Sequence, residues 1–370
     1  MKYRTNRMMT AFVAAFAAAC VAYAAKPADA VERLLNSRAS GSRRAYMAAA
    51  EEVAAAAKSG APLQRYVLAI VSRDEDAPPA AKLDPSTREK WISESRELFR
   101  KVGDRTDNPL VWYLLAIDRA DTNLLRVAAE KGNVQALNAW GNLQLDFGVN
   151  AVNTNEAARC RNRAVSLFRK AAGMGDANGL YNLGMCYARG LGEKRDDTSA
   201  FLCFRSAAEK GHPAAMNSFG WFLREGRIGA PDPEFAVKWF EKASDLGEPT
   251  ATFNLALAHL RGEGVPKDET KAMAFMKEAA ESGSPEAMDA WGVALMRGDG
   301  VEMDKAAAVR WFRKSATEGY PPAMENLVQC YDNGWGVPAD AALALKWKMR
   351  SRAARGDAAA ATWLKQNNFD

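Results

Sequence analysis

A short phrase that recurs at a nearly constant interval is the feature that most constrains the fold of this 370-residue chain. The phrase consists of two small residues, one or two variable residues and a glycine, and four of its six intervals are 36 residues long. A constant period of this size predicts a stack of similar units, because a small unit buries its apolar face only against its neighbours. The repeat glycines are Gly132, Gly175, Gly211, Gly247, Gly283, Gly319 and Gly356.

The first half of each unit has the pattern of a helix. Small or bulky apolar residues lie four, eight and twelve positions after the repeat glycine, which places them on one helix face. A further glycine recurs nine positions after the repeat glycine, inside this helix, and predicts close approach of a neighbouring helix. The helix is expected to end at a glycine that suits a left-handed cap. These capping glycines are Gly190, Gly226, Gly262, Gly298 and Gly334.

The second half of each unit has the pattern of another helix. An acidic residue such as Asp268, Asp304 or Asp340 favours its start, because a carboxylate accepts hydrogen bonds from the free amides there. A small residue and an aromatic or apolar pair follow at equivalent positions. The sequence therefore predicts an all-α fold, a right-handed α/α superhelical solenoid of two-helix repeats with a period of 36.

Three recurrent stretches resemble one known family. They are residues 181–190 (Tyr-Asn-Leu-Gly-x-x-Tyr-x-x-Gly), 261–268 (Arg-Gly-Glu-Gly-Val-Pro-x-Asp) and 308–316 (Ala-x-x-Trp-Phe-Arg-Lys-x-Ala). This pattern resembles the Sel-one-like repeat (SLR) family, which is related to the tetratricopeptide repeats. The resemblance covers residues 133–356, and it implies an α/α superhelix that binds proteins or peptides as a scaffold.

The repeat pattern also predicts the organisation of the rest of the chain. Residues 133–356 are expected to form six Sel-one-like repeats, and residues 357–370 a C-terminal capping helix. Residues 31–132 are expected to form a helical N-terminal region with degenerate repeats, continuous with the solenoid, and a separate small helical domain is the alternative. The first interval, of 43 residues, predicts one or two extra helical turns around residues 150–162. Within the N-terminal region, Ser86 and Glu89 fit a capping box.

Residues 1–30 have the layout of a secretory signal peptide. A basic start with Lys2, Arg4 and Arg7 precedes an uncharged, alanine-rich stretch, and small residues suit cleavage after Ala24 or Ala30. The prediction is a secreted or periplasmic protein. A retained membrane anchor and a lipidated Cys20 are the alternatives, and membrane contact is expected only through one of these. Without residues 1–30, 46 basic residues face 44 acidic ones, which indicates no nucleic-acid partner.

Signatures of catalysis and of metal binding fail on their spacing. The two histidines, His212 and His259, are not at metal-ligand spacing, and His259 falls on the apolar stripe of a first helix, which favours a packing role. Neither Ser-x-x-Lys nor Gly-x-Ser-x-Gly occurs. We therefore expect no catalytic residue, no metal ligand and no cofactor. A secreted enzyme of cell-wall or β-lactam chemistry and a lipid-anchored surface structural protein remain the alternatives to a binding scaffold.

The cysteines leave two interpretations open. Cys186 and Cys203 are expected on opposite helices of one hairpin, where they form a disulfide in an oxidising compartment or pack as two small thiols. Cys160 and Cys330 have no evident mates. The regular cysteine positions of some secreted relatives are absent.

A second stripe on the first helices is the predicted binding surface. It lies six, ten, thirteen and fourteen positions after each repeat glycine, and its residue types vary from unit to unit. Because the first helices line the concave side of such a superhelix, we expect a groove for a protein or peptide. The alternative is that the apolar members pack between units and the arginines are solvated. The candidate partner-binding residues are Tyr181, Met185, Arg189, Asn217, Trp221, Arg224, Phe253, Leu257 and Arg261.

Overall fold

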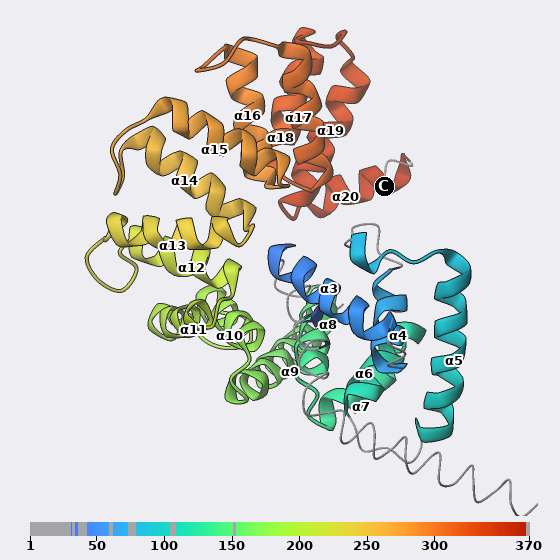
Figure 1. The fold of residues 1–370 in the computed structure, drawn as a ribbon. Helices are drawn as coiled ribbons and strands as arrows, with labels where there is room; N and C mark the ends of the chain where they lie inside the picture. The colour runs from blue at the N-terminus through green and yellow to red at the C-terminus, as the bar shows by residue number, and fades with distance from the viewer. Residues whose placement is uncertain are drawn as a thin grey trace, which may run out of the picture. The chain divides into compact units, whose positions relative to one another are not determined.

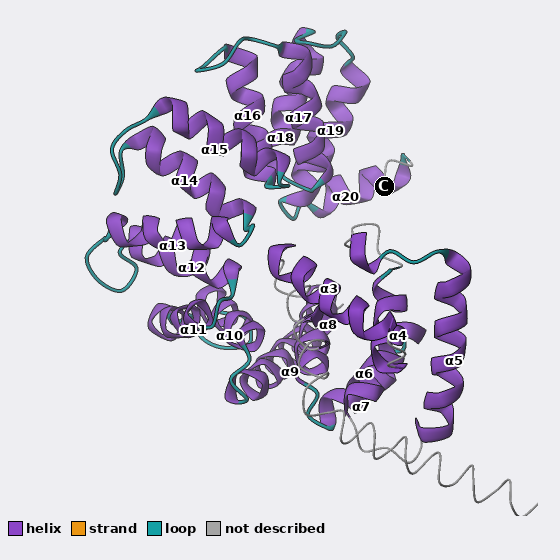
Figure 2. Cartoon of the chain, viewed as in Figure 1, coloured by secondary structure: helices purple, strands orange, loops and turns teal. Residues whose placement is uncertain are grey.

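The computed structural model describes residues 31, 34–35, 43–58, 62–72, 79–103, 109–150 and 153–367. These residues form helices joined by turns and loops, with no strand among them (Figure 2). Contacts divide the chain into two compact parts, Met1–Ala215 and Met216–Asp370, and each part is considered by itself. The predicted signal peptide, its cleavage sites after Ala24 and Ala30, and Cys20 lie outside the described residues.

The described residues of the N-terminal region form helices. Its elements are α3 (Arg43–Lys58), α4 (Pro62–Val71), the short 3-10 helix η2 (Pro79–Ala81), α5 (Pro85–Gly103), α6 (Pro109–Arg119) and α7 (Thr122–Glu130) (Figure 1). Tyr66 and Leu114 are among the large side chains buried in its core. The expected capping box at Ser86 is corrected, because α5 starts earlier and Asp84 accepts hydrogen bonds from both Ser86 Oγ and the Thr87 amide. Both hydrogen bonds lower the pKa of Asp84.

The later helices follow one another in pairs, which we number as repeats 1 to 6 (Figure 1). Repeat 1 is α8 (Val134–Asn150) with α9 (Thr154–Gly173), and repeat 2 is α10 (Ala177–Arg189) with α11 (Asp197–Glu209). Repeat 3 is α12 (Pro213–Arg224) with α13 (Pro233–Asp245), and repeat 4 is α14 (Pro249–Arg261) with α15 (Glu269–Glu281). Repeat 5 is α16 (Pro285–Arg297) with α17 (Lys305–Thr317), and repeat 6 is α18 (Pro321–Asn333) with α19 (Ala341–Ala354). A single helix, α20 (Ala358–Gln366), follows them.

The ends of these helices are fixed by residues of the two kinds that the sequence analysis singled out, glycines and aspartates. Gly190, Gly262, Gly298 and Gly334 end first helices in the left-handed conformation, with φ between 67° and 79°. Each second helix from repeat 2 onward starts after an aspartate whose carboxylate accepts a hydrogen bond from a backbone amide of the first turn. These aspartates are Asp196, Asp232, Asp268, Asp304 and Asp340.

The recurrent glycine inside the first helix has a packing cause. A methyl group at Gly184 would lie 2.8 Å from the ring of Phe204, and one at Gly292 would lie 2.6 Å from the ring of Phe312. Both rings belong to the second helix of the same repeat and are buried. Repeat 4 has Ala256 at the glycine position and the flexible Met276 in place of the ring. The expectation of a close helix approach at these positions is confirmed.

The longer first interval is accommodated within both helices of repeat 1. Helix α8 has 17 residues and α9 has 20, whereas each helix of repeat 2 has 13. The extra turns that we expected around residues 150–162 are therefore shared between two helices, on either side of the start of α9 at Thr154.

Candidate functional site

The predicted binding residues lie on the first helices of three successive repeats. Those on α10 belong to the N-terminal part of the chain, whereas those on α12 and α14 belong to the C-terminal part. Arg189 and Arg261 are exposed, and the other seven are partly buried. We call the C-terminal set the first-helix face. It consists of Asn217, Trp221 and Arg224 on α12 and Phe253, Leu257 and Arg261 on α14.

A polar cluster joins α12 to α14 within this face. Asn254 Nδ2 donates to Asn217 Oδ1 at 2.7 Å, and Arg224 Nη1 donates to Asn254 Oδ1 at 3.3 Å. Arg224 also forms an ion pair with Glu225 at 2.9 Å, and its side chain is only 16% exposed. Asn217 and Arg224 therefore have a structural role in addition to any contact with a partner. Asn254 is buried and was missed in the sequence analysis, because no apolar periodicity marks a single buried amide.

Trp221 presents a partly exposed aromatic ring beside this cluster. Its ring is 5.5 Å from that of Phe222 in an edge-to-face arrangement, and the Arg227 guanidinium lies 5.4 Å from its centroid. A cation over a tryptophan face is a stabilising contact. Trp221 is thus held in place while part of its surface stays available, which is the usual state of an aromatic anchor in a binding site.

Phe253 and Leu257 continue the face toward repeat 5. Phe253 packs against the buried cluster that includes Met276, Met288 and Trp291, so much of its surface is used within the protein. Leu257 is partly buried, as are Val293 and Met296 on α16. Arg261 is exposed and lies 3.7 Å from Glu263.

Tyr181 has a different environment on α10. Its ring stacks on that of His212 with centroids 4.6 Å apart, and it also approaches Phe204 at 5.9 Å. His212 is buried, and its Nδ1 accepts a hydrogen bond from the Ala215 amide at 3.1 Å, so it caps the start of α12. Burial lowers the pKa of His212 to about 4. These contacts explain Tyr181 by packing, whereas Met185 stays partly buried and Arg189 exposed.

His259 lies where the sequence placed it, on the packed side of α14. Its ring stacks on Phe275 at 5.7 Å, and its buried Nδ1 has no hydrogen-bond partner. Among the described residues, no group of three or more His, Cys, Asp and Glu side chains has the arrangement of a metal site.

The described cysteines are free thiols. Cys186 and Cys203 pack in the same apolar cluster between α10 and α11, and the bridge that the sequence allowed is not formed. Burial raises the pKa of Cys186, Cys203 and Cys330 to about 11, which makes them poor nucleophiles at neutral pH. Cys160 is partly buried. A Cys186–Cys203 disulfide stays a prediction for the oxidised protein.

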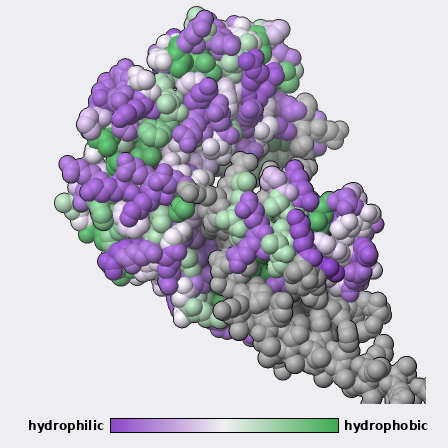
Figure 3. Space-filling model, in the orientation of Figure 1, coloured by the Kyte–Doolittle hydropathy of each residue, from purple (hydrophilic) through white to green (hydrophobic). Residues whose placement is uncertain are grey.

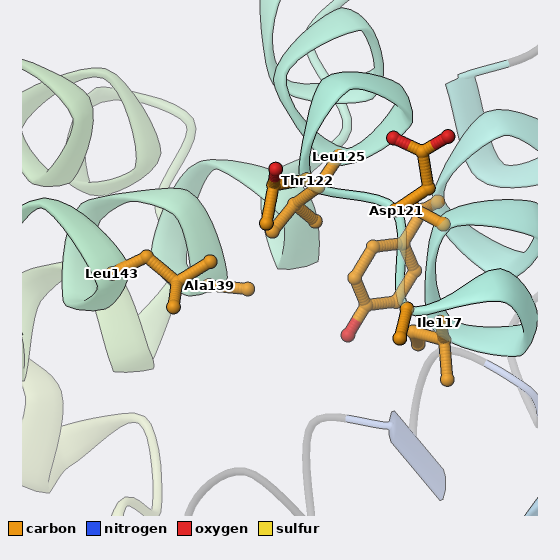
Figure 4. A pocket seen from close by; sticks show the side chains of 9 residues that line it. Ile117, Asp121, Thr122, Leu125, Ala139 and Leu143 are labelled. Carbon is orange, nitrogen blue, oxygen red and sulfur yellow. The ribbon is translucent and has the colours of Figure 1, made fainter.

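Two clefts lie outside the first-helix face. One, of about 270 Å³, is an open cleft between α6, α7 and α8, with walls from Ile117, Leu125, Ala139 and Leu143 (Figure 4). Its Asp121 already accepts hydrogen bonds from the Asn123 and Leu124 amides. The cleft is therefore mainly apolar and lacks the convergent polar groups of a catalytic site.

The other cleft, of about 560 Å³, lies between α18 and α19. Glu325 and Lys348 are among the residues that line it, but Glu325 is already bound by Ser351 at 3.1 Å and by Arg355 at 2.7 Å.

Elsewhere on the visible surface, hydrophobic patches are interspersed among hydrophilic residues (Figure 3). Within the described part of the chain, no helix has the length and apolar character needed to cross a bilayer.

The helix pairs, their glycine caps and their loops define an α/α repeat protein. The Sel1 repeat model matches residues 161–176, 177–212, 213–248, 249–284, 285–320 and 321–347, and the chain belongs to the Sel1 repeat family. The resemblance stated from the sequence and the predicted all-α solenoid fold are thereby confirmed. Sel1 repeats generally form scaffolds for protein interactions. A comparison with curated proteins finds no match.

Several solved structures are similar to this chain. A Sel1 repeat protein from Oxalobacter formigenes is 25% identical with a TM-score of 0.56, over 67% of this chain and 97% of that one. A protective antigen of uropathogenic Escherichia coli with an SLR fold is 25% identical with a TM-score of 0.40, over 83% of this chain and 72% of that one. An immunity protein from Pseudomonas aeruginosa is 18% identical with a TM-score of 0.47, over 60% of this chain and 83% of that one.

Proposed function

We propose that this protein is an exported, non-enzymatic scaffold that binds a protein or peptide segment through its first-helix face. The observation that carries this proposal is the state of Trp221, whose ring is held by Phe222 and Arg227 and yet stays partly exposed. Tryptophan and arginine contribute most to binding energy at protein interfaces. The general role of Sel1 repeats as interaction scaffolds supports the same class of function.

The partner's chemistry follows from the partly exposed side chains that accompany Trp221 along the first helices. On the next two first helices, Leu257, Val293 and Met296 are partly buried apolar side chains that suit one apolar face of a peptide. The exposed Arg261 suits an acidic group at the edge of that face. An amphipathic segment with apolar residues and a flanking carboxylate fits these features.

Export is the second element of the proposal. It rests on the basic, apolar and small-residue order of residues 1–30, which is typical of a cleaved signal peptide. Amino-terminal sequencing of protein from a cell-envelope fraction tests it. A mature chain starting after Ala24 or Ala30 supports export, and one that starts at Met1 in the cytosol contradicts it.

The binding test compares two tryptophans of similar setting. Trp221→Ala removes the proposed anchor, whereas Trp311→Ala removes a partly buried tryptophan on α17 that carries Lys314 at 4.3 Å from its centroid. We expect Trp221→Ala to abolish the capture of envelope proteins by the immobilised mature chain, with a melting temperature near that of the wild type. Trp311→Ala should retain capture. Equal capture by both variants would contradict the proposed face, and a large loss of stability in Trp221→Ala alone would assign Trp221 to the core.

A further inference from the structure

Side-chain hydrogen bonds at equivalent positions join several successive first helices. At three junctions, an asparagine seven positions after one repeat glycine donates to a residue six positions after the preceding one. The bonds join Asn182 to Asn138 at 3.4 Å, Asn254 to Asn217 at 2.7 Å and Asn326 to Asp289 at 2.8 Å. The three donors are spaced by 72 residues and not by 36. They join repeat 1 to 2, repeat 3 to 4 and repeat 5 to 6.

The junction between repeats 4 and 5 has no such bond at the equivalent place. The two positions are occupied there by Phe253 and Ala290, and Phe253 packs into an apolar cluster. The amide contacts therefore do not link all of the repeats alike.

The loop glycines approach the preceding repeat closely at the same junctions that have the side-chain hydrogen bonds. Gly192, in repeat 2, lies so close to repeat 1 that a methyl group on it would be 2.6 Å from the Arg161 carbonyl oxygen. A methyl group at Gly264 would overlap the Pro233 carbonyl oxygen, and one at Gly336 that of Lys305. At the junction of repeats 4 and 5, a methyl group at Gly300 would meet only the flexible side chain of Met273, with Cγ at 3.0 Å. The close backbone contacts again join repeats 1 to 2, 3 to 4 and 5 to 6.

A third contact has the same period. Tyr187 of repeat 2 interacts with the Arg169 guanidinium of repeat 1 and raises its pKa, and Tyr331 of repeat 6 accepts a hydrogen bond from Arg313 of repeat 5 at 2.6 Å. The residue at the tyrosine position of repeat 5 is Leu295, which has no side-chain hydrogen-bonding group.

The core residues eight positions after the repeat glycine alternate as well. Even-numbered repeats have leucine there and odd-numbered repeats have a large aromatic residue. The leucines are Leu183, Leu255 and Leu327, and the aromatic residues are Trp140, Phe219 and Trp291.

We infer that the building block of this solenoid is a 72-residue pair of repeats, and that the chain deforms between repeats 4 and 5, where two pairs meet. Within a pair, a hydrogen bond from an asparagine side chain and a close backbone contact fix one helix hairpin on the next at two separate places. Between repeats 4 and 5, apolar side chains and a flexible methionine occupy those places, so the two hairpins can shift at little cost. This inference rests on packing alone and is independent of the proposed binding function.

Two glycine substitutions on one loop position test the inference. Gly264 and Gly300 have nearly the same left-handed backbone, with φ of 76° and 70°, so the strain of introducing alanine is similar at both. Only Gly264→Ala also drives a methyl group into backbone across a junction. We expect Gly264→Ala to lower the melting temperature of the mature chain at least twice as much as Gly300→Ala. Equal decreases would overturn the inference.

Hydrogen exchange of the wild-type chain keeps the inference testable if Gly264→Ala does not fold. The paired arrangement predicts that α13 and α14, on either side of the repeat 3 to 4 junction, open together with one free energy. Helices α15 and α16, on either side of the repeat 4 to 5 junction, should open separately. Protection that changes evenly along the repeats, with no step between α15 and α16, would contradict the pairing.

Discussion

The junction of repeats 3 and 4 and the junction of repeats 4 and 5 differ in how they are held, although both join helix pairs of one family in one compact part of the chain. The first has the Asn217–Asn254 bond and the close approach of Gly264 to Pro233. The second has Phe253 and the side chain of Met273 at the equivalent places. The difference teaches that one consensus sequence specifies the fold of every repeat, while a few positions outside the consensus set the stiffness of each junction.

The pH dependence of stability tests the helix cap at the start of repeat 3. The buried His212 caps α12 only through an unprotonated Nδ1, and burial lowers its pKa to about 4 from the ordinary 6.5. As the pH falls below about 6.5, the unfolded chain binds a proton there that the folded chain does not, so stability falls until about pH 4 and then levels off. The loss is about 3 kcal/mol at most. Chemical denaturation between pH 7.5 and 4 measures it.

His212→Asn is the matched variant for that titration. Asparagine caps a helix without titrating, so the variant should lose most of this pH dependence. An unchanged pH dependence would show that another group causes it.

Removal of one side-chain hydrogen bond tests the junction of repeats 3 and 4 directly. Asn254→Ala leaves Asn217 and Arg224 without their shared partner in a largely buried place. We expect a loss of about 2 kcal/mol in the free energy of unfolding, measured by urea denaturation. Asn333→Ala is the control, because Asn333 is exposed and bonds only to the Gln329 carbonyl within its own helix, and its loss should stay below about 0.5 kcal/mol. Similar losses in the two variants would remove the special role of the junction.

A gain of stability is expected from introducing a tyrosine–arginine contact between repeats 3 and 4. Repeats 3 and 4 have Glu241 and His259 where the neighbouring pairs have arginine and tyrosine, and the His259 Nδ1 is buried without a partner. The double substitution Glu241→Arg with His259→Tyr should stabilise the chain by about 1 kcal/mol, more than the two single substitutions together. A double-mutant cycle of melting curves measures the coupling. Additive effects would show that the third pair does not form.

Much of the fold follows from the sequence because its signals are local. The repeat glycines, the capping glycines and the acidic helix starts each act within one turn, and the structure has helices that end and begin there. The interior glycines are also explained locally, by the aromatic ring of the facing helix, as Gly184 and Phe204 illustrate.

The 72-residue pairing was not predicted, although its residues are visible in the sequence. Leu183 and Trp140 were treated as one class of bulky apolar residue, since both suit the same buried position of a helix. Asn217 and Arg224 were predicted to contact a partner, and the structure also bonds both to Asn254. Hydrogen bonds between repeats depend on side-chain geometry across a junction, and apolar periodicity carries no information about that geometry.

Two deletions test the pairing most directly. Removal of residues 249–284 takes out repeat 4, and removal of residues 249–320 takes out repeats 4 and 5; in both variants Glu248 is followed by a proline, Pro285 or Pro321. The longer deletion places Asn326 against Asn217, whereas the shorter one places Ala290 there.

The measurement is the urea midpoint of the two deletion variants. If the 36-residue repeat were the building block, the shorter array would be the less stable one, because stability in a solenoid grows with the number of repeats. The paired arrangement predicts the reverse, with the variant that lacks 72 residues unfolding at the higher urea concentration. A higher midpoint for the variant that lacks 36 residues would contradict it.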